Sequence, residues 1–113
     1  MGSRILNGVE ATGPGPAMRC GAAQHSVFVW FSNSGGSVTA LVVTLEGRIR
    51  GADGPPDVWA LLGTLTFAGG DLTAKCKYAF VANTPVDDVR ANITTLTETG
   101  TTKVYAEYKS ELN

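Results

Sequence analysis

Apolar and polar residues alternate with a period of two along most of the chain from Gln24 onward. No stretch shows the helical period of about 3.6 residues. Alternation of this kind is typical of β-strands, whose successive side chains point to opposite faces of a sheet. Clusters of Gly, Pro, Asn and Asp separate the alternating segments, as expected for turns. The pattern predicts six or seven strands, among them residues 25–32, 37–50, 58–67, 73–82, 86–96 and 102–109.

Two of the predicted strands are apolar on both faces. Residues 27–31 are apolar without a break, which suits a strand that is buried on both faces or one that faces a partner. Residues 37–45 carry apolar side chains at both odd and even positions, so this segment is expected to be a central strand. Its polar end, from Glu46 to Arg50, is expected to emerge into solvent, with Gly47 as a possible site of a bulge.

Three further strands have a predicted inward face. The apolar positions at alternate residues of 58–67 are Trp59, Leu61, Leu65 and Phe67. In 73–82, Lys75 and Lys77 are expected to point outward, opposite inward Cys76, Tyr78 and Phe80. In 102–109, Val104, Ala106 and Tyr108 are expected to point inward.

Tyr105 is the aromatic residue that we expect at the surface. It shares the outward face of residues 102–109 with Lys103 and Glu107. Trp30, Trp59 and Tyr78 lie at inward or doubly apolar positions, where packing in the core is the expected role. A single exposed ring is a weak indication of a sugar-binding platform.

The strand pattern predicts an all-β fold, an antiparallel β-sandwich or small jelly roll with an extended N-terminal arm. Short turns between successive strands and the absence of a crossover helix favour antiparallel pairing. Residues 21–113 are expected to form the single sandwich domain. Residues 1–20 are expected to form the arm, because the Gly-Pro alternation at 13–16 does not suit a helix or a paired strand. Ile5, Leu6 and Val9 are the apolar residues with which such an arm would contact a neighbouring subunit.

Composition narrows the range of functions. The chain has 113 residues, 43% hydrophobic and 17% charged, with 9 basic and 10 acidic residues. This near-equal number of basic and acidic residues gives no stripe of positive charge that could bind the phosphates of a nucleic acid. No segment approaches the length of a membrane span, and no apolar stretch near the start resembles a signal peptide, so we expect synthesis in the cytoplasm and no membrane partner. The low charge suits a protein that packs against others.

Candidate chemistry is sparse, and we expect no catalytic residues, no cofactor and no metal. His25 is the single histidine, which is too few for a multi-histidine metal site. Cys20 and Cys76 are too far apart in sequence for a CxxC element, and are expected to be free thiols in a reducing compartment. The sequence leaves open whether the two cysteines meet.

Aspartates gather in the predicted loops, at positions Asp53, Asp57, Asp71, Asp87 and Asp88. If two of these loops met at one end of the sandwich, their carboxylates could bind calcium. The simpler interpretation is that Asp stabilises turns by accepting hydrogen bonds from nearby backbone N–H groups. Arg90 is expected to pair locally with Asp87 or Asp88.

Two segments carry a resemblance to a known group of proteins. They are residues 42–51, VVTLEGRIRG, followed by 58–64, VWALLGT, and residues 85–94, PVDDVRANIT, followed by the closing strand VYAEY at 104–108. Over residues 25–109 the chain resembles small β-rich structural proteins of tailed bacteriophages. The double proline in residues 51–57 and the Gly-Pro segment depart from that pattern.

The resemblance implies a virion component, most plausibly a head decoration (cement) protein made in the host cytoplasm and located on the capsid surface. Such proteins are typically small, often homotrimeric, and bind the major capsid protein. Two alternatives remain open at this point: a carbohydrate- or receptor-binding β-sandwich module, and a tail or connector subunit of the particle. An enzyme is not expected.

Overall fold

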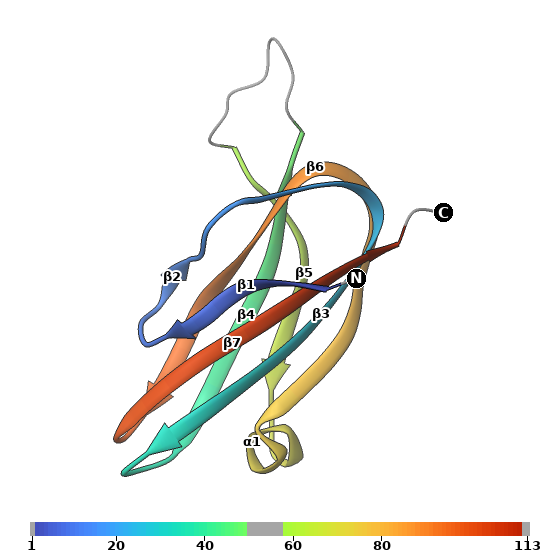
Figure 1. The fold of residues 1–113 in the computed structure, drawn as a ribbon. Coiled ribbons are helices and arrows are strands. Elements are labelled where there is room, and N and C mark those ends of the chain that lie inside the picture. The colour runs from blue at the N-terminus through green and yellow to red at the C-terminus, as the bar shows by residue number, and fades with distance from the viewer. Residues whose placement is uncertain (1, 50–57, 112–113) are drawn as a thin grey trace.

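The computed structural model describes residues 2–49 and 58–111 and contains strands throughout, with one short helix in the described part (Figure 1). The predicted loop at residues 50–57, with Asp53, Asp57 and the double proline, lies outside the described residues. The strands are β1 (Gly2–Val9), β2 (Gly13–Pro14), β3 (Met18–Ser34), β4 (Val38–Arg48), β5 (Ala60–Phe67), β6 (Cys76–Glu98) and β7 (Thr101–Glu111), and helix α1 spans Gly70–Ala74.

The strands form two antiparallel layers that share β6 (Figure 1). The first half of β6 pairs with β3, which pairs with β7 and through it with the outer strand β1. The second half of β6 pairs with β4 and the two-residue strand β2, and β4 pairs with β5. The prediction of an all-β antiparallel sandwich is confirmed.

Alternate residues of the strands fill one core between the layers. Val27, Val29 and Phe31 of β3 point into it, and so do Val104 and Ala106 of β7. The second layer contributes a matching set of aliphatic and aromatic residues: Leu41, Val43, Leu45, Leu65, Phe67, Val89, Ala91 and Ile93. The central position predicted for residues 37–50 is confirmed, because β4 lies between β6 and β5.

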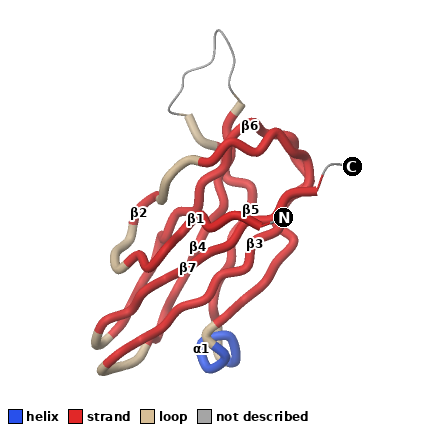
Figure 2. Tube along the Cα trace, viewed as in Figure 1, coloured by secondary structure: helices blue, strands red, loops and turns tan. Residues whose placement is uncertain are grey.

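The N-terminal segment belongs to the sandwich. Instead of an extended arm over residues 1–20, the chain forms β1, which pairs with β7, and β2, which pairs with β6 (Figure 2). The Gly-Pro sequence is compatible with pairing because only Gly13 and Pro14 take part, at the outer side of β6. The amide of Gly15 also donates to the carbonyl of Ala91 at 2.7 Å. Backbone pairing therefore ties most of this segment to the domain.

Strand β6 is longer than predicted. The sequence Asn83-Thr84-Pro85 predicts a break between two strands, yet β6 continues through it. The pairing of β6 with β3 shifts register here, between Ala22 opposite Val86 and Gln24 opposite Asn83. A proline is tolerated in a strand at such an irregularity, where no ladder hydrogen bond is lost.

The segment before β6 is the short helix α1, so the predicted strand at residues 73–82 begins three residues late, at Cys76. Lys75 ends the helix in the left-handed conformation, with φ of 63°. Lys77 donates to Asp71 at 3.0 Å, and this bond together with one from the Ala68 amide lowers the pKa of Asp71. Among the described residues, no helix has the length and apolar character of a membrane span.

The turn between β3 and β4 and the turn between β6 and β7 interlock at one end of the sandwich. The Thr99 amide donates to the Ser37 carbonyl at 2.8 Å, and the Ser37 amide donates to Thr99 Oγ1 at 3.0 Å. Gly36 lies so close to Thr99 that an added Cβ would overlap its carbonyl. Gly100 has φ of 76° and lies equally close to the backbone of Ser34. Both positions therefore require glycine.

A polar pair lies inside the apolar core. His25 is fully buried, and its Nδ1 forms a short hydrogen bond with the hydroxyl of Tyr108, which is also buried. Burial raises the pKa of Tyr108 far above its usual value, so the hydroxyl stays protonated and available as a donor. The pair joins β3 to β7 inside the sheet, where an unpaired polar group would be costly.

We expect Tyr108→Phe to lower the free energy of unfolding by about 1–3 kcal/mol, because the buried His25 ring loses this hydrogen bond. Urea denaturation followed by circular dichroism measures the change. Tyr78→Phe is the matched control, since that ring is 61% exposed, and should change stability by no more than about 0.5 kcal/mol. Equal effects of the two substitutions would contradict the role given to the pair.

Candidate interaction surface

The outer face of the sheet formed by β1, β7, β3 and the first half of β6 carries a row of large aromatic side chains. Val27, Val29 and Phe31 point inward, so the strand pleat turns Phe28 and Trp30 to the outside. Cross-strand pairing then places Tyr78 of β6 beside Phe28, and Tyr105 of β7 beside Trp30. We call Arg4, Phe28, Trp30, Tyr78 and Tyr105 the aromatic face.

The rings of the aromatic face contact one another in sequence. The centroids of Trp30 and Tyr105 are 5.5 Å apart and their planes are 11° from parallel. Phe28 lies 5.7 Å from Trp30 and 6.3 Å from Tyr78, in tilted arrangements. Aromatic pairs of this geometry stabilise their mutual positions by about 0.5–1.5 kcal/mol each. The four rings therefore form a preformed apolar surface.

Arg4 of β1 covers part of this surface. Its guanidinium carbon lies 5.0 Å from the ring centroid of Trp30 and 5.8 Å from that of Tyr105. Such cation–π contacts favour a fixed position for the side chain. Glu107 lies 4.0 Å from Arg4, and both side chains are about half exposed. The charged groups of Arg4 and Glu107 therefore lie at the border of the rings and remain hydrated.

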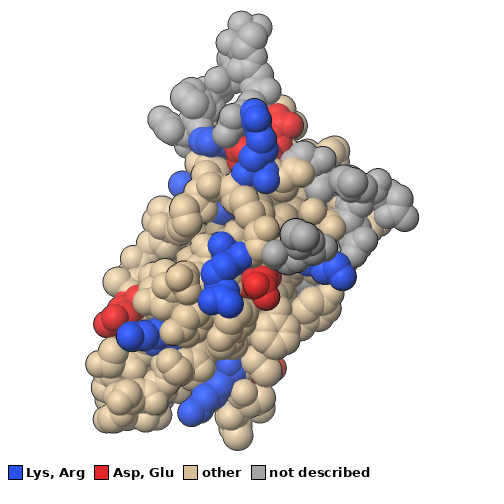
Figure 3. Space-filling view, in the orientation of Figure 1, with Lys and Arg blue, Asp and Glu red and all other residues tan. Residues whose placement is uncertain are grey.

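The surface on this side of the molecule is mostly uncharged, with isolated Lys, Arg, Asp and Glu side chains (Figure 3). Phe28 is 40% exposed and Tyr78 is 61% exposed, whereas Trp30 and Tyr105 are half-buried. Exposed apolar residues scattered singly are common on soluble proteins, but a contiguous aromatic patch is typical of an interaction site.

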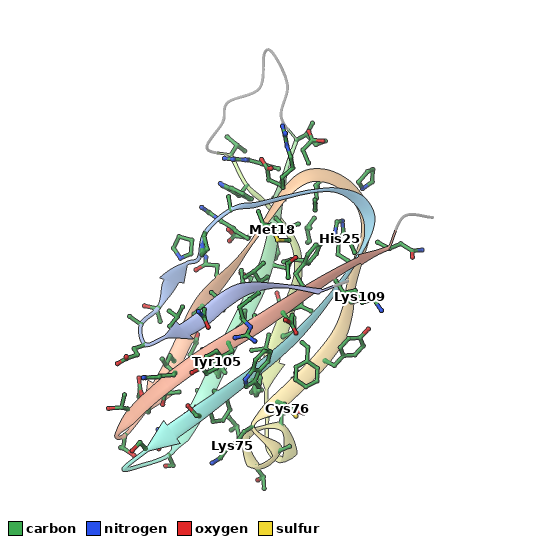
Figure 4. All side chains as sticks on the ribbon, in the orientation of Figure 1. Met18, His25, Lys75, Cys76, Tyr105 and Lys109 are labelled. Atoms are coloured by element: carbon green, nitrogen blue, oxygen red, sulfur yellow. The ribbon has the colours of Figure 1, made fainter. Side chains whose placement is uncertain are left out.

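A hollow of about 310 Å³ adjoins Phe28 and Tyr78. Its lining combines the two aromatic rings with polar and charged groups: Ser26, Phe28, Tyr78, Glu107, Tyr108 and Lys109. Lys109 lies on β7 toward the C-terminal end of the same sheet face, two positions beyond Glu107 (Figure 4). The hollow thus extends the aromatic face toward a polar border.

Tyr105, the surface aromatic expected from the sequence, lies in the aromatic face (Figure 4). The other three predicted interface residues lie elsewhere. Ile5 and Leu6 fill this chain's own core, with 2% and 1% of their surfaces exposed, because β1 pairs with β7. They are therefore not free to anchor an arm on a neighbour. Val9 is partly buried against the same core.

Most of the aromatic face was not expected from the sequence. Tyr78, predicted to point inward, points outward, because Val29 and Lys77 are register partners and Phe28 pairs with Tyr78. Trp30 was expected in the core, but it lies on the outer face beside Phe28. The sequence feature that pointed to this surface was the unbroken apolar run at 27–31, which is compatible with a strand that faces a partner.

Leu61 also differs from the predicted pattern. It was placed on one face with Leu65 and Phe67, yet it is 63% exposed while those two are buried. Pairing with β4 shifts register at this point, from Leu45 opposite Gly63 to Glu46 opposite Leu61. The skipped residue, Leu62, packs against the core in place of Leu61.

A charged cluster lies on the other sheet, around Trp59. Arg48 and Arg90 place their guanidinium carbons 4.5 Å and 4.4 Å from the ring centroid of Trp59. Arg90 donates to Glu46 at 2.6 Å, and Arg48 donates to Asp88 at 2.7 Å. The expected local pairing of Arg90 with Asp87 or Asp88 is therefore corrected: the cross-strand register of β4 and β6 selects Glu46.

Two aspartates of the calcium hypothesis are used in ion pairs. Asp71 accepts a hydrogen bond from Lys77, and Asp88 accepts one from Arg48. Within residues 2–49 and 58–111, no group of three or more His, Cys, Asp or Glu side chains is arranged to hold a metal ion.

The cysteines are both free thiols. Cys20 lies near the start of β3, close to the pairing of Met18 with Val89, and Cys76 lies opposite Trp30. These positions are at the two ends of the β3–β6 ladder, so the sheet itself keeps the thiols apart. Figure 4 shows Cys76 beside helix α1.

Comparison with known proteins gives distant structural likenesses. No protein-family model matches the chain, and neither does any curated protein sequence. The SPBc2 prophage-derived protein YomS is 12% identical, covering 96% of this chain and 92% of that one, with a TM-score of 0.46. A putative alpha-L-fucosidase from Bacteroides thetaiotaomicron is 9% identical, covering 96% of this chain and 23% of that one, with a TM-score of 0.47.

A chain of the acid-stable capsid of Helicobacter pylori bacteriophage KHP30 is 14% identical, covering 100% of this chain and 95% of that one, with a TM-score of 0.35. Likenesses with identities and TM-scores this low give no argument about the function of this chain.

We expect Arg48→Ala to lower the free energy of unfolding by about 2–4 kcal/mol, because the fully buried Asp88 carboxylate loses the ion pair with Arg48. Part of the loss comes from the Trp59 contact. Thermal and urea unfolding measure the change.

Lys77→Ala is the matched control, since it removes a cation from an ion pair in which both side chains are 32% exposed. Its effect should be about 0–1 kcal/mol. A loss for Arg48→Ala no larger than that of the control would contradict the structural importance of the buried pair.

Proposed function

We propose that the chain is a non-enzymatic structural subunit of a phage particle, which attaches to other proteins of the particle through the aromatic face. The observation that carries this proposal is the contiguous patch of Phe28, Trp30, Tyr78 and Tyr105 bordered by Arg4. Tyr, Trp, Phe and Arg are the residues enriched at the centres of protein interfaces. The sequence resemblance of residues 25–109 to small β-rich phage proteins is the reason for proposing a phage particle as the assembly.

The finer proposal is a decoration, or cement, protein on the capsid surface, with the major capsid protein as partner. A protein of this type needs a docking surface that is fixed before binding, so that little ordering free energy is lost. The ring contacts and the Arg4 side chain provide such a surface. Many copies on one shell would then add their individual contacts through multivalency.

A carbohydrate- or receptor-binding module is the second candidate, and the hollow beside Phe28 and Tyr78 favours it. Two aromatic rings with Glu107 and Lys109 nearby could stack on a sugar and hydrogen-bond its hydroxyls. Arg4 argues against a flat sugar platform over the rest of the face, because its guanidinium covers Trp30 and Tyr105 where a sugar would stack. Protein contact is therefore preferred.

The particle itself provides the first test. Particles purified on a density gradient from a culture that carries the gene should contain the chain in a fixed ratio to the major capsid protein. Heads that lack the chain should bind the recombinant protein in co-sedimentation and become more resistant to heat. Absence of the chain from purified particles would refute the structural role.

We expect the double variant Phe28→Ser/Tyr78→Ser to weaken binding to such heads by about tenfold or more, because two interface rings are lost. Both side chains are exposed, so the fold should be retained in circular dichroism. Ile49→Ser removes an apolar residue that is 69% exposed and lies outside the aromatic face, and is the control. Undiminished head binding by the double variant would exclude the aromatic face. Glycan-array binding that the double variant abolishes would favour the carbohydrate module.

A further inference from the structure

The two layers end in edge strands of opposite character. In the strand order, β1 is last at one end and β5 is last at the other. An edge strand exposes backbone N–H and C=O groups along one side, and these can pair with a strand of another chain. Native proteins usually block such pairing with charges, prolines or bulges.

Strand β1 carries these protections. Its pairing with β7 shifts register twice, between Arg4 and Leu6 and between Asn7 and Val9. Gly8 has φ of 74°, which bends the edge away from the geometry of a regular strand. Arg4 adds a charge. A further strand could not pair regularly along this edge.

Strand β5 has one irregularity near its start, where Leu62 is skipped in the pairing with β4, and lacks the other protections beyond that point. Its sequence, ALLGTLTF, has no charged residue and no proline. Five consecutive residues, Gly63 to Phe67, pair with β4 without interruption. Every second residue of that stretch therefore directs its N–H and C=O away from β4. No described strand pairs on that side. Leu61 and the neighbouring Val58 are also more than 60% exposed.

We propose that β5 pairs with β5 of a second copy of this chain, in antiparallel orientation about a two-fold axis. The sheet of β2, β6, β4 and β5 would then continue through the axis into the same sheet of the second copy. This inference is independent of the proposed function, since it uses only the strand edge.

The chemistry of β5 favours a second copy as the partner. A strand without charge meets no like-charge repulsion when it pairs with itself, whereas the same pairing of a charged edge would be opposed. Antiparallel pairing is self-complementary, as a two-fold interface requires. An axis at Leu65 places Thr64 opposite Thr66 of the second copy, and both threonines are exposed in one chain. Cross-strand Thr pairs stabilise sheets.

The mass of the full chain in solution tests the inference. Sedimentation over a concentration series should give a dimer, and amide hydrogen exchange in residues 63–67 should slow as the dimer forms. A dimer also differs from the trimer that the phage resemblance implies. A monomer at every concentration, or a trimer with fast exchange in β5, would overturn the inference.

The double variant Thr64→Lys/Thr66→Lys places like charges opposite each other at the axis. We expect the dimer dissociation constant to rise by about tenfold or more, with an unchanged circular dichroism spectrum. Thr95→Lys/Thr97→Lys adds the same charge on exposed positions of the inner strand β6 and should leave dissociation unchanged. A dimer equally resistant to both double variants would show that it forms through another surface. Head binding is measured separately, so failure here leaves the proposed function intact.

Discussion

Strand β6 hydrogen-bonds to β3 along its first half and to β4 along its second half. Because one continuous backbone belongs to both layers, the position of each layer relative to the other is set by pairing as well as by apolar contact. Asp88 and Val89 pair with β3 on one side and with β4 on the other, so β6 passes from one layer to the other at these residues. The aromatic face and the charged cluster around Trp59 lie on the outer sides of the two layers that β6 holds together.

The period-two pattern was sufficient to predict the fold class, because alternation along a strand depends only on the chain itself. It was less reliable for the direction of individual side chains. Leu61 and Tyr78 were placed inward and lie outside. The skipped Leu62 puts Leu61 out of phase with Leu65 and Phe67, and the pairing of Phe28 with Tyr78 turns that ring outward. The N-terminal strands β1 and β2 were missed because the Gly and Pro residues of the segment 1–20 indicated an unpaired arm, whereas the pairing depends on β7 and β6, which are distant in sequence.

The site was predictable in part. Tyr105 stood out because charged neighbours share its face, which marks that side of β7 as solvated. Phe28 and Trp30 lay in an unbroken apolar run, which gives no indication of which residues are buried. Arg4 and Glu46 acquire their partners through cross-strand register, which the sequence alone does not specify. The part of the site that could not be predicted from the sequence therefore consists mainly of interactions between segments that are distant in sequence.

The interlocked turns around Gly36 and Gly100 have a consequence for how the protein can evolve. Two hairpins share hydrogen bonds there, and neither glycine leaves space for a side chain. Insertion of residues in one turn would displace the other, so changes in loop length at this end would require matched changes in both. Domain fusions and new loops are more readily accommodated elsewhere on the molecule, and the interlocked end is expected to keep a constant length across divergent descendants.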